Sequence, residues 1–268
     1  MNQPSSTSVS VAPGAEPFSA DGGRVGVLLS HGFTGSPVSM TPWGRDLAER
    51  GYTVRVPRLP GHGTTWQEMN TTRWTDWYGE LDAALTELRE RCDVVAVGGL
   101  SMGGCLALRL AQQRPDDVDA VVVVNPAIAS RDKRLALVPV LKHVLPSMAA
   151  IGGDIKKPGV SESAYTRTPL KALHSMMQMW TDVQANLGRI SAPVLFFRSE
   201  DDHVVDDSTI GLVKAGLTAP AEYVSLTNSF HVATLDHDAP LIFERTVSFL
   251  AEQLGPVGTD ARNETGDV

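Results

Sequence analysis

A serine between two glycines, where an apolar run meets a helix-like segment, constrains the fold of this chain more than any other sequence feature. The pattern Gly-x-Ser-x-Gly falls at Gly99, Ser101 and Gly103, between an apolar run at residues 94–97 and a helix-like segment at residues 105–113. On a sharp strand-to-helix turn the serine backbone is strained, and a side chain at either glycine would collide with the neighbouring strand or helix. The turn lifts the hydroxyl clear of the sheet, at the positive end of the following helix. The alternative, a glycine-rich turn with an incidental serine, is disfavoured by the flanking strand and helix.

Short apolar strands alternate with helix-like segments along most of the chain. The predicted strands span residues 24–30, 52–56, 93–97, 118–124, 193–198 and 221–226. The predicted helices span residues 38–50, 74–91, 105–113, 209–216 and 240–254, and residues 57–72 are expected to form a loop. Such alternation implies parallel strands joined by right-handed crossovers. The expected fold class is therefore α/β, with a mostly parallel central sheet flanked by helices.

The alternation stops after the strand that ends near Val124. Residues 127–190 show no clear strand but two apolar stretches, at residues 135–151 and 170–187, separated by a polar linker. We interpret them as a helical cap inserted over the sheet. The expected organisation is one domain at residues 21–254 with the cap at residues 127–190. The segments at residues 1–20 and 255–268 are expected to be a disordered N-terminal tail and a flexible C-terminal tail.

Composition narrows the class of protein. With 268 residues, 42% of them hydrophobic, the chain can bury the core of one α/β domain. A formal net charge of −8 argues against a nucleic-acid partner, which would require a basic stripe. The first 20 residues lack the features of a signal peptide, and no apolar run reaches the roughly 18 residues needed to cross a membrane. Cys92 and Cys105 have no metal-binding spacing, so we interpret both as small core residues and expect a cytoplasmic location.

A carboxylate is expected directly after the strand at residues 193–198. A serine hydroxyl needs a base to take its proton, and that base is normally a histidine held by a carboxylate. Ligands of open parallel sheets lie beyond the carboxyl ends of the strands. Three consecutive acids follow this strand, at Glu200, Asp201 and Asp202. The apolar pair Val204-Val205 should turn back under the sheet, which favours Asp202, with Asp201 as the alternative and Glu200 as a solvated residue.

His231 is the expected base because it follows the last predicted strand and precedes the last helix. The competing histidines are His31, His62, His143, His174, His203 and His237. The order serine, acid, histidine, each after its own strand, matches the order of α/β-hydrolase triads. Two backbone amides are also needed to hold a developing oxyanion. We assign them to Met102, the residue after the serine, and to Phe33, in the loop after the first strand.

With these residues in place, the chain resembles the serine α/β-hydrolases, and among them the small bacterial monoacylglycerol lipases and related carboxylesterases. The stretches that carry the resemblance are HGFTGSP (31–37), GYTVRVPRLPGHGT (51–64), GLSMGG (99–104), AIGGDIKKPGV (150–160), AYTRTPL (164–170), SEDDHVV (199–205) and NSFHVATLD (228–236). The resemblance covers about residues 25–249 and includes the cap, which makes it specific. One departure is Asp206-Asp207, where relatives often carry proline, and it could shift the acid loop slightly.

The resemblance implies a role for each matching residue. Ser101 would be the nucleophile, Asp202 the orienting acid and His231 the base, with the amides of Phe33 and Met102 as the oxyanion hole. Ile151 and Glu162 fall where cap residues of the family line the pocket for the glycerol head. For Glu162 a surface helix glutamate is the alternative interpretation.

The expected activity is hydrolysis of carboxylic esters through an acyl-enzyme, with monoacylglycerols as substrates and with no metal or cofactor. The expected partner is a small lipid ester, with transient contact with lipid interfaces and no stable membrane insertion. Candidates for the acyl-chain wall, or for ordinary packing between cap and core, are Leu137, Val140, Leu141, Met176, Met177, Met179 and Trp180. The alternatives are a broad-specificity carboxylesterase for short and medium chains, an acyltransferase or thioesterase on the same fold, and a non-catalytic binding protein. An intact triad argues against the last.

Overall fold

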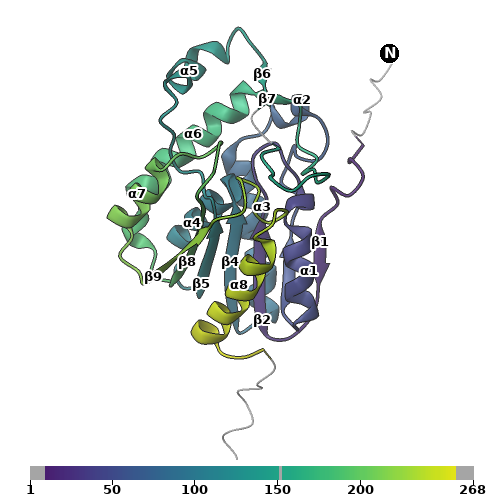
Figure 1. The fold of residues 1–268 in the computed structure, drawn as a ribbon, viewed down its shortest axis with the longest axis vertical. Helices are drawn as coiled ribbons and strands as arrows, with labels where there is room; N and C mark the ends of the chain where they lie inside the picture. The colour runs from purple at the N-terminus through teal and green to yellow at the C-terminus, as the bar shows by residue number, and fades with distance from the viewer. Residues whose placement is uncertain (1–9, 151–152, 258–268) are drawn as a thin grey trace, which may run out of the picture.

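The computed structural model of the chain describes residues 10–150 and 153–257, which fold around a seven-stranded sheet (Figure 1). The strand order is β1-β3-β2-β4-β5-β8-β9. The strands are β1 (Phe18–Ala20), β2 (Val25–Ser30), β3 (Thr53–Val56), β4 (Val94–Leu100), β5 (Ala120–Val124), β8 (Val194–Ser199) and β9 (Ala221–Leu226). Neighbouring strands are parallel except β1, which runs antiparallel to β3. The predicted mostly parallel sheet is confirmed.

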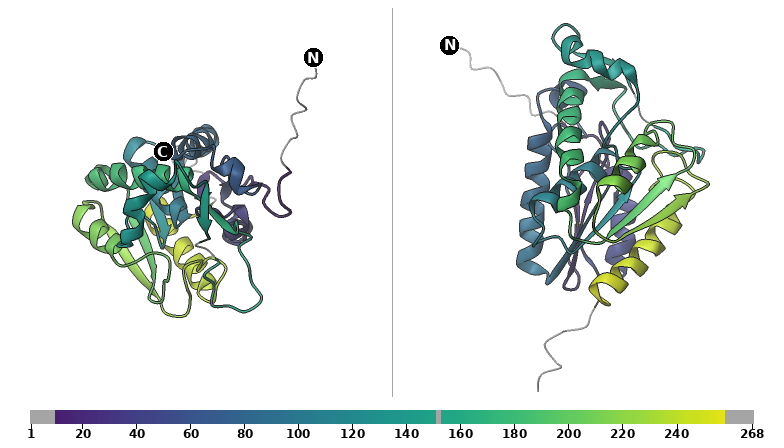
Figure 2. Two further views of the ribbon diagram at one scale, coloured as in Figure 1. Left: turned by 90° about the horizontal axis from the view of Figure 1, so that it is seen from above. Right: turned by 90° about the vertical axis from the view of Figure 1, so that its left-hand side faces the viewer.

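Helices cover both faces of the sheet (Figure 2). Helices α1 (Thr41–Glu49) and α8 (Ala239–Leu254) pack on one face, and α3 (Trp74–Arg91) and α4 (Met102–Gln113) pack on the other. Successive side chains of β4 alternate between the two cores, as a strand with two buried faces requires. Val95 and Val97 join the core under α3 and α4, whereas Ala96 and Leu100 join the core under α1 and α8.

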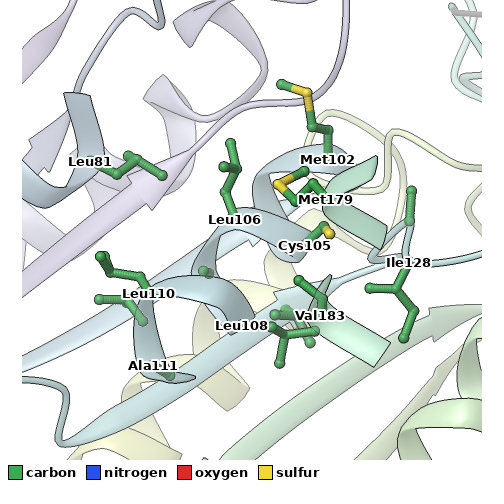
Figure 3. Packing of buried hydrophobic residues seen from close by; sticks show 14 of the residues in the cluster. Leu81, Met102, Cys105, Leu106, Leu108, Leu110, Ala111, Ile128, Met179 and Val183 are labelled. Carbon is green, nitrogen blue, oxygen red and sulfur yellow. The ribbon is translucent and has the colours of Figure 1, made fainter. Parts of the chain in front are cut away.

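Helix α4, which follows the serine turn, is buried along almost its whole length. Figure 3 shows Met179 and Val183 of α6 (Leu170–Ala185) beside Cys105 and Leu108 of α4, in the same apolar cluster. Cys92 and Cys105 are both free and buried, as predicted. The apolar cluster therefore anchors α6 to the helix that begins directly after Ser101.

Residues 127–190 differ in part from the expected helical cap. The second apolar stretch forms α6, but the first contains only a 3-10 turn (Lys133–Leu137) and the four-residue α5 (Val138–Leu141). The expectation of no strand is wrong, because β6 (Ser147–Ala149) and β7 (Arg167–Pro169) pair antiparallel. Pro146 disfavours the helical conformation of Leu145, so no helix can run on from this stretch into β6. In Figure 1, α5, β6 and β7 lie together at one end of the molecule, beyond the sheet.

The two ends of the described chain are more ordered than expected. The expectation of a disordered tail is wrong for residues 10–20, because β1 pairs with β3 and Ala15 is buried. At the other end Val257 packs against the core under α1 and α8. The loop expected at residues 57–72 contains the short helix α2 (Trp66–Met69), which is capped where the Thr65 side chain accepts a hydrogen bond from the Glu68 amide. The remaining helix, α7 (Ser208–Gly216), lies between β8 and β9 in the chain.

Candidate active site

Ser101 is the single residue between β4 and α4, and its backbone adopts the strained conformation that the Gly-x-Ser-x-Gly pattern predicts. Its φ is 56° and its ψ is −119°, a left-handed region that residues with a side chain rarely occupy. A Cβ at Gly99 would lie 2.3 Å from the carbonyl carbon of Gly103, and a Cβ at Gly103 would lie 2.1 Å from the carbonyl oxygen of Ser30. Both glycines are therefore required by close backbone approach, as predicted.

Backbone hydrogen bonds hold this turn against the end of β5. The Ser101 amide donates to the carbonyl of Val124 at 3.0 Å. The Ser101 carbonyl accepts from the amides of Cys105 and Ala127, both at 3.1 Å. The strain at Ser101 is thus maintained by its neighbours, which is typical of a residue with a functional conformation.

Asp202 is the acid that the structure brings to His231. Its Oδ2 lies 2.9 Å from Nδ1 of His231, and its Oδ1 accepts hydrogen bonds from the amides of Val204 and Val205 at 2.9 and 2.8 Å. The carboxylate is fully buried. Burial by itself raises the pKa of Asp202, but the hydrogen bond from His231, its charge and the two amides outweigh burial, so the pKa is lowered and the carboxylate stays ionised.

The neighbouring acids lie elsewhere. Asp201 is exposed, and Glu200, also exposed, accepts a hydrogen bond from the hydroxyl of Ser225 at 2.7 Å. Asp206 accepts from the amide of Arg131 at 2.6 Å and from the amide of Ser208 at 2.8 Å, at the start of α7. Although Asp206-Asp207 departs from the pattern of the relatives, these two hydrogen bonds of Asp206 support the end of the acid loop.

Two polar residues that the sequence analysis did not single out hold the loop of His231. Asn125, with a φ of 44°, donates through Nδ2 to the His231 carbonyl at 2.9 Å and accepts from the Ser199 amide at 2.8 Å. The Asp154 carboxylate accepts from the His231 amide at 3.2 Å. The only sequence signal for Asn125 is a polar residue directly after a buried strand, and Asp154 gives none beyond its charge.

The other histidines have different roles. His31 is buried, with Nδ1 3.0 Å from the Gly32 carbonyl and Nε2 3.2 Å from the Leu59 amide, which indicates a neutral ring protonated at Nδ1. Burial lowers the pKa of His31 to about 4, and the pKa of the buried His62 is also lowered, mainly by burial. His203 lines the same cavity as Ser101, but its ring is paired with Asp154, and this hydrogen bond raises the pKa of His203.

The remaining histidines, His143, His174 and His237, are absent from the lining of the cavity that contains Ser101.

The loop after β2 lies against the serine. Gly32, Phe33 and Ser101 line the same cavity, and a Cβ at Gly32 would lie 3.5 Å from the Cβ of Ser101. Met102 is the first residue of α4, where backbone amides have no partner within the helix. The two residues assigned to the oxyanion hole therefore flank Ser101 on separate segments.

A cavity of about 380 Å³ contains Ser101, Asp202 and His231 in its lining. Its apolar wall includes Leu135, Leu173, Met176, Trp180 and Val205. Two of the acyl-wall candidates, Met176 and Trp180, are thus in place. The others are not: Leu137 and Val140 are exposed, Met179 packs in the core against α4, and Leu141 and Met177 are partly buried against that core. Within the short α5, Val140 faces solvent whereas Val138 is buried, which sequence periodicity did not predict.

Glu162 also lines the cavity, and it is only 8% exposed. The alternative of a surface helix glutamate is wrong, because the residue lies outside any helix, between β6 and β7. Its Oε1 accepts a hydrogen bond from the Gly153 amide at 2.7 Å. Burial raises the pKa of Glu162. Its proposed neighbour Ile151 lies outside the described residues. Across residues 10–150 and 153–257, no group of three or more His, Cys, Asp or Glu side chains is arranged to hold a metal ion.

A serine at a strand-to-helix turn, in the same cavity as a buried aspartate–histidine pair at the carboxyl ends of parallel strands, defines an α/β-hydrolase. The sequence pattern of the family described as serine aminopeptidase S33 matches residues 23–238, and the chain belongs to this family.

Two relatives match nearly the whole chain. It is 42% identical over 251 residues to a thermostable monoacylglycerol lipase of Bacillus sp. (strain H-257), which covers 91% of this chain and 98% of the relative. It is 26% identical to a carboxylesterase of Bacillus subtilis (strain 168), which covers 88% and 96%.

Solved structures show the same fold. One from work on LipS and LipT, two metagenome-derived lipolytic enzymes, superimposes with a TM-score of 0.88 at 41% identity, over 91% of this chain and all of that one. A monoacylglycerol lipase of Paleococcus ferrophilus superimposes with a TM-score of 0.76 at 19% identity, over 88% and 98% of the two chains, and shows the fold alone. The predictions of an α/β-hydrolase and of an enzyme of the esterase and lipase group are confirmed.

Proposed function

We propose that this enzyme hydrolyses monoacylglycerols to glycerol and free fatty acid through an acyl-enzyme on Ser101. The observation that carries the proposal is a single cavity that combines Ser101 and the Asp202–His231 pair with an apolar wall and one buried carboxylate, Glu162. The name of the 42% identical relative, a monoacylglycerol lipase, supports the same substrate class.

In the proposed reaction, Oγ of Ser101 attacks the ester carbonyl while Nε2 of His231 takes its proton. Asp202 accepts a hydrogen bond from Nδ1 of His231, which leaves Nε2 unprotonated to act as the base and stabilises the imidazolium that forms. The amides of Phe33 and Met102 stabilise the tetrahedral oxyanion. His231 then protonates the departing glycerol oxygen, and a water molecule repeats the sequence on the acyl-enzyme.

The two ends of a monoacylglycerol differ in polarity, and the cavity does too. The wall of Leu173, Met176 and Trp180 suits an acyl chain, which gains from leaving water. Glu162 is positioned to accept hydrogen bonds from glycerol hydroxyls through the carboxylate oxygen that does not bind Gly153. Ile151 is proposed as its neighbour in the same pocket on the strength of the family resemblance.

An exposed apolar surface beside the cavity supports transient contact with a lipid interface. We call it the α5 patch: it consists of Leu137, Val140, Val144 and Leu145, which are 48–72% exposed. Leu135, on the preceding turn, lines the cavity, so the patch borders the site. In the sequence, Lys133 precedes the patch and Lys142 lies between Val140 and Val144. Contiguous exposed apolar side chains mark interaction surfaces. Among the described helices none is both long and apolar enough to cross a bilayer.

An activity panel tests the substrate class. Monoacylglycerols of several chain lengths are compared with di- and triacylglycerols and with p-nitrophenyl butyrate, with and without an added alcohol or thiol acceptor. We expect monoacylglycerols to have the highest kcat/KM and free fatty acid to be the main product. A main product carrying the added acceptor would instead indicate an acyltransferase. Ser101→Ala is the control, and ester hydrolysis near the wild-type rate in this variant would overturn the proposed mechanism.

The cytoplasm is the compartment we propose, since the two cysteines are free and buried rather than paired.

A further inference from the structure

The guanidinium of Arg198 binds the same carboxylate oxygen as the imidazole of His231. Nη1 of Arg198 lies 2.7 Å from Oδ2 of Asp202, and Nδ1 of His231 lies 2.9 Å from that oxygen. Arg198 is the penultimate residue of β8, and its side chain is only 14% exposed. The acid of the proposed triad therefore carries a buried cation as well as its histidine.

Arg198 also closes the loop that presents Asp202. Its Nη2 donates to the carbonyl of Val205 at 2.7 Å and lies 3.2 Å from Oδ1 of Asp207. The amides of Val204 and Val205 occupy the other oxygen of Asp202. With two donors on each oxygen, the Asp202 carboxylate cannot rotate without breaking a charge-assisted hydrogen bond.

The charges around His231 give this arrangement an electrostatic consequence. Asp202 and Arg198 face its ring as an ion pair, the Asp154 carboxylate binds its backbone amide, and the buried Glu162 lines the same cavity. The exposed His203 pairs with Asp154 and not with His231. A cation near a base disfavours the protonated base. When the ring of His231 is protonated, the imidazolium therefore lies beside a carboxylate, Asp202, whose charge Arg198 already balances.

We propose that Arg198 is a positioning residue: it locks Asp202 against His231, and its charge keeps His231 unprotonated, and so competent as a base, at a lower pH than Asp202 alone would allow. This inference rests on the proposed function, since it concerns the base of that reaction. The competing interpretation is a salt bridge that only closes the loop at residues 199–207.

The test is the pH profile of kcat/KM, measured with the soluble ester p-nitrophenyl butyrate between pH 4.5 and 9. Arg198→Gln and Arg198→Met remove the charge in two chemically different ways, so that the failure of one to fold leaves the other. Arg198→Lys keeps the charge. Asp207→Asn is the matched control, because it removes an exposed partner of the same guanidinium without touching Asp202.

We expect both neutral variants to move the acid limb of the profile upward by about one pH unit, because a charge at this range shifts a neighbouring titration by one to three units. Relative to wild type, the kcat/KM of the neutral variants is then reduced about tenfold more at acid pH than at pH 8. Arg198→Lys and Asp207→Asn should leave the acid limb in place. A fall of equal size at every pH, or an unmoved limb, would overturn the proposal and leave only a loop-closing salt bridge.

A readout without catalysis separates this inference from the proposed function. The His231 ring is titrated by NMR in the inactive Ser101→Ala background, with Ser101→Ala/His231→Ala identifying its signal. The midpoint should rise when Arg198 becomes Gln or Met and stay in place when it becomes Lys. If the wild-type protein hydrolyses no ester but the midpoint still rises, the proposed function fails and the effect of Arg198 on His231 stands. If wild type hydrolyses esters and the midpoint does not move, the proposal for Arg198 fails alone.

Discussion

Nδ1 of His231 lies 2.9 Å from Oδ2 of Asp202 although the two residues are 29 positions apart in the chain. Adjacent parallel strands bring them together. Ser199, the last residue of β8, pairs in register with Leu226, the last residue of β9, so the loops that follow both strands begin at the same edge of the sheet. The positions of Asp202 and His231 therefore both depend on the pairing of β8 with β9.

The hydrogen bond between Asp202 and His231 predicts that Asp202→Asn lowers kcat far more than Asp201→Asn does. An asparagine at the position of Asp202 favours the wrong tautomer of His231, and the corresponding loss in a serine protease is about 10⁴-fold in kcat. Asp201 is exposed, so its change should cost about twofold or less, as surface changes usually do. Initial rates with p-nitrophenyl butyrate decide the ranking. The reverse order would move the acid by one residue.

Gly103→Ala should destabilise the protein by about 3 kcal/mol, the upper end of the usual cost of overpacking, or prevent its folding. The added Cβ would lie 2.1 Å from the carbonyl oxygen of Ser30, in backbone that cannot yield easily. Gly211→Ala in α7 is the matched control, since a Cβ there meets nothing within 4 Å. That change should stabilise the protein by about 0.5–1 kcal/mol, the helix preference for alanine. Urea unfolding at pH 7 measures both, and equal stabilities would contradict the close approach.

Stability should fall as the pH drops from 6.5 towards 4, partly because of His31. The pKa of His31 is lowered by burial from 6.5 to about 4, so the unfolded chain binds more protons than the folded one in this window. The contribution to the free energy of unfolding falls by about 2 kcal/mol between pH 7 and pH 5.

Between pH 7 and pH 5 the free energy of unfolding, measured with urea, should fall by about 2 kcal/mol less in His31→Gln than in wild type. His237→Gln, at an exposed position, is the control and should keep the wild-type dependence. An unchanged pH dependence in His31→Gln would show that His31 is not held neutral.

Glu162→Gln should lower kcat/KM for monoacylglycerols about tenfold, since a hydrogen bond to a charged group contributes about 1.5–3 kcal/mol and the amide keeps only part of it. Glutamine can still accept the hydrogen bond from the Gly153 amide, so the local fold is preserved. The rate with p-nitrophenyl butyrate, which has no glycerol, should change little. Glu200→Gln, at an exposed acid, serves as the control for the loss of one charge. Equal losses on both substrates would argue against a glycerol contact at Glu162.

The double variant Val140→Ser/Val144→Ser should weaken binding to lipid vesicles about thirtyfold, since each of the two exposed branched side chains contributes about 1 kcal/mol when buried in lipid. Co-sedimentation with phosphatidylcholine vesicles, with and without phosphatidylglycerol, measures the binding. Leu241→Ser changes a side chain of α8 that is 40% exposed and absent from the cavity lining, and it should leave binding unchanged. Undiminished binding by the double variant would exclude the α5 patch as the contact surface.

The features of this protein that depend on local chemistry could be predicted from the order of its amino acids. The glycines around Ser101 reflect a steric requirement within five residues, and the alternation of apolar runs with helical periodicity is a property of each segment alone. The same local signals indicated His231, because it follows the last strand, and the α/β fold, because strands and helices alternate.

Which side chains contact one another became clear from the folded arrangement of the chain. The choice of Asp202 over Asp201 depends on the direction in which one carboxylate points; the sequence favoured Asp202 but kept Asp201 as the alternative. The roles of Asn125 and Arg198 depend on contacts between β5, β8 and the His231 loop, for which no periodicity is informative. Apolar residues of the cap look alike in sequence, yet Met176 lines the cavity and Val140 faces solvent, because burial is set by what packs opposite each helix and not by the helix itself.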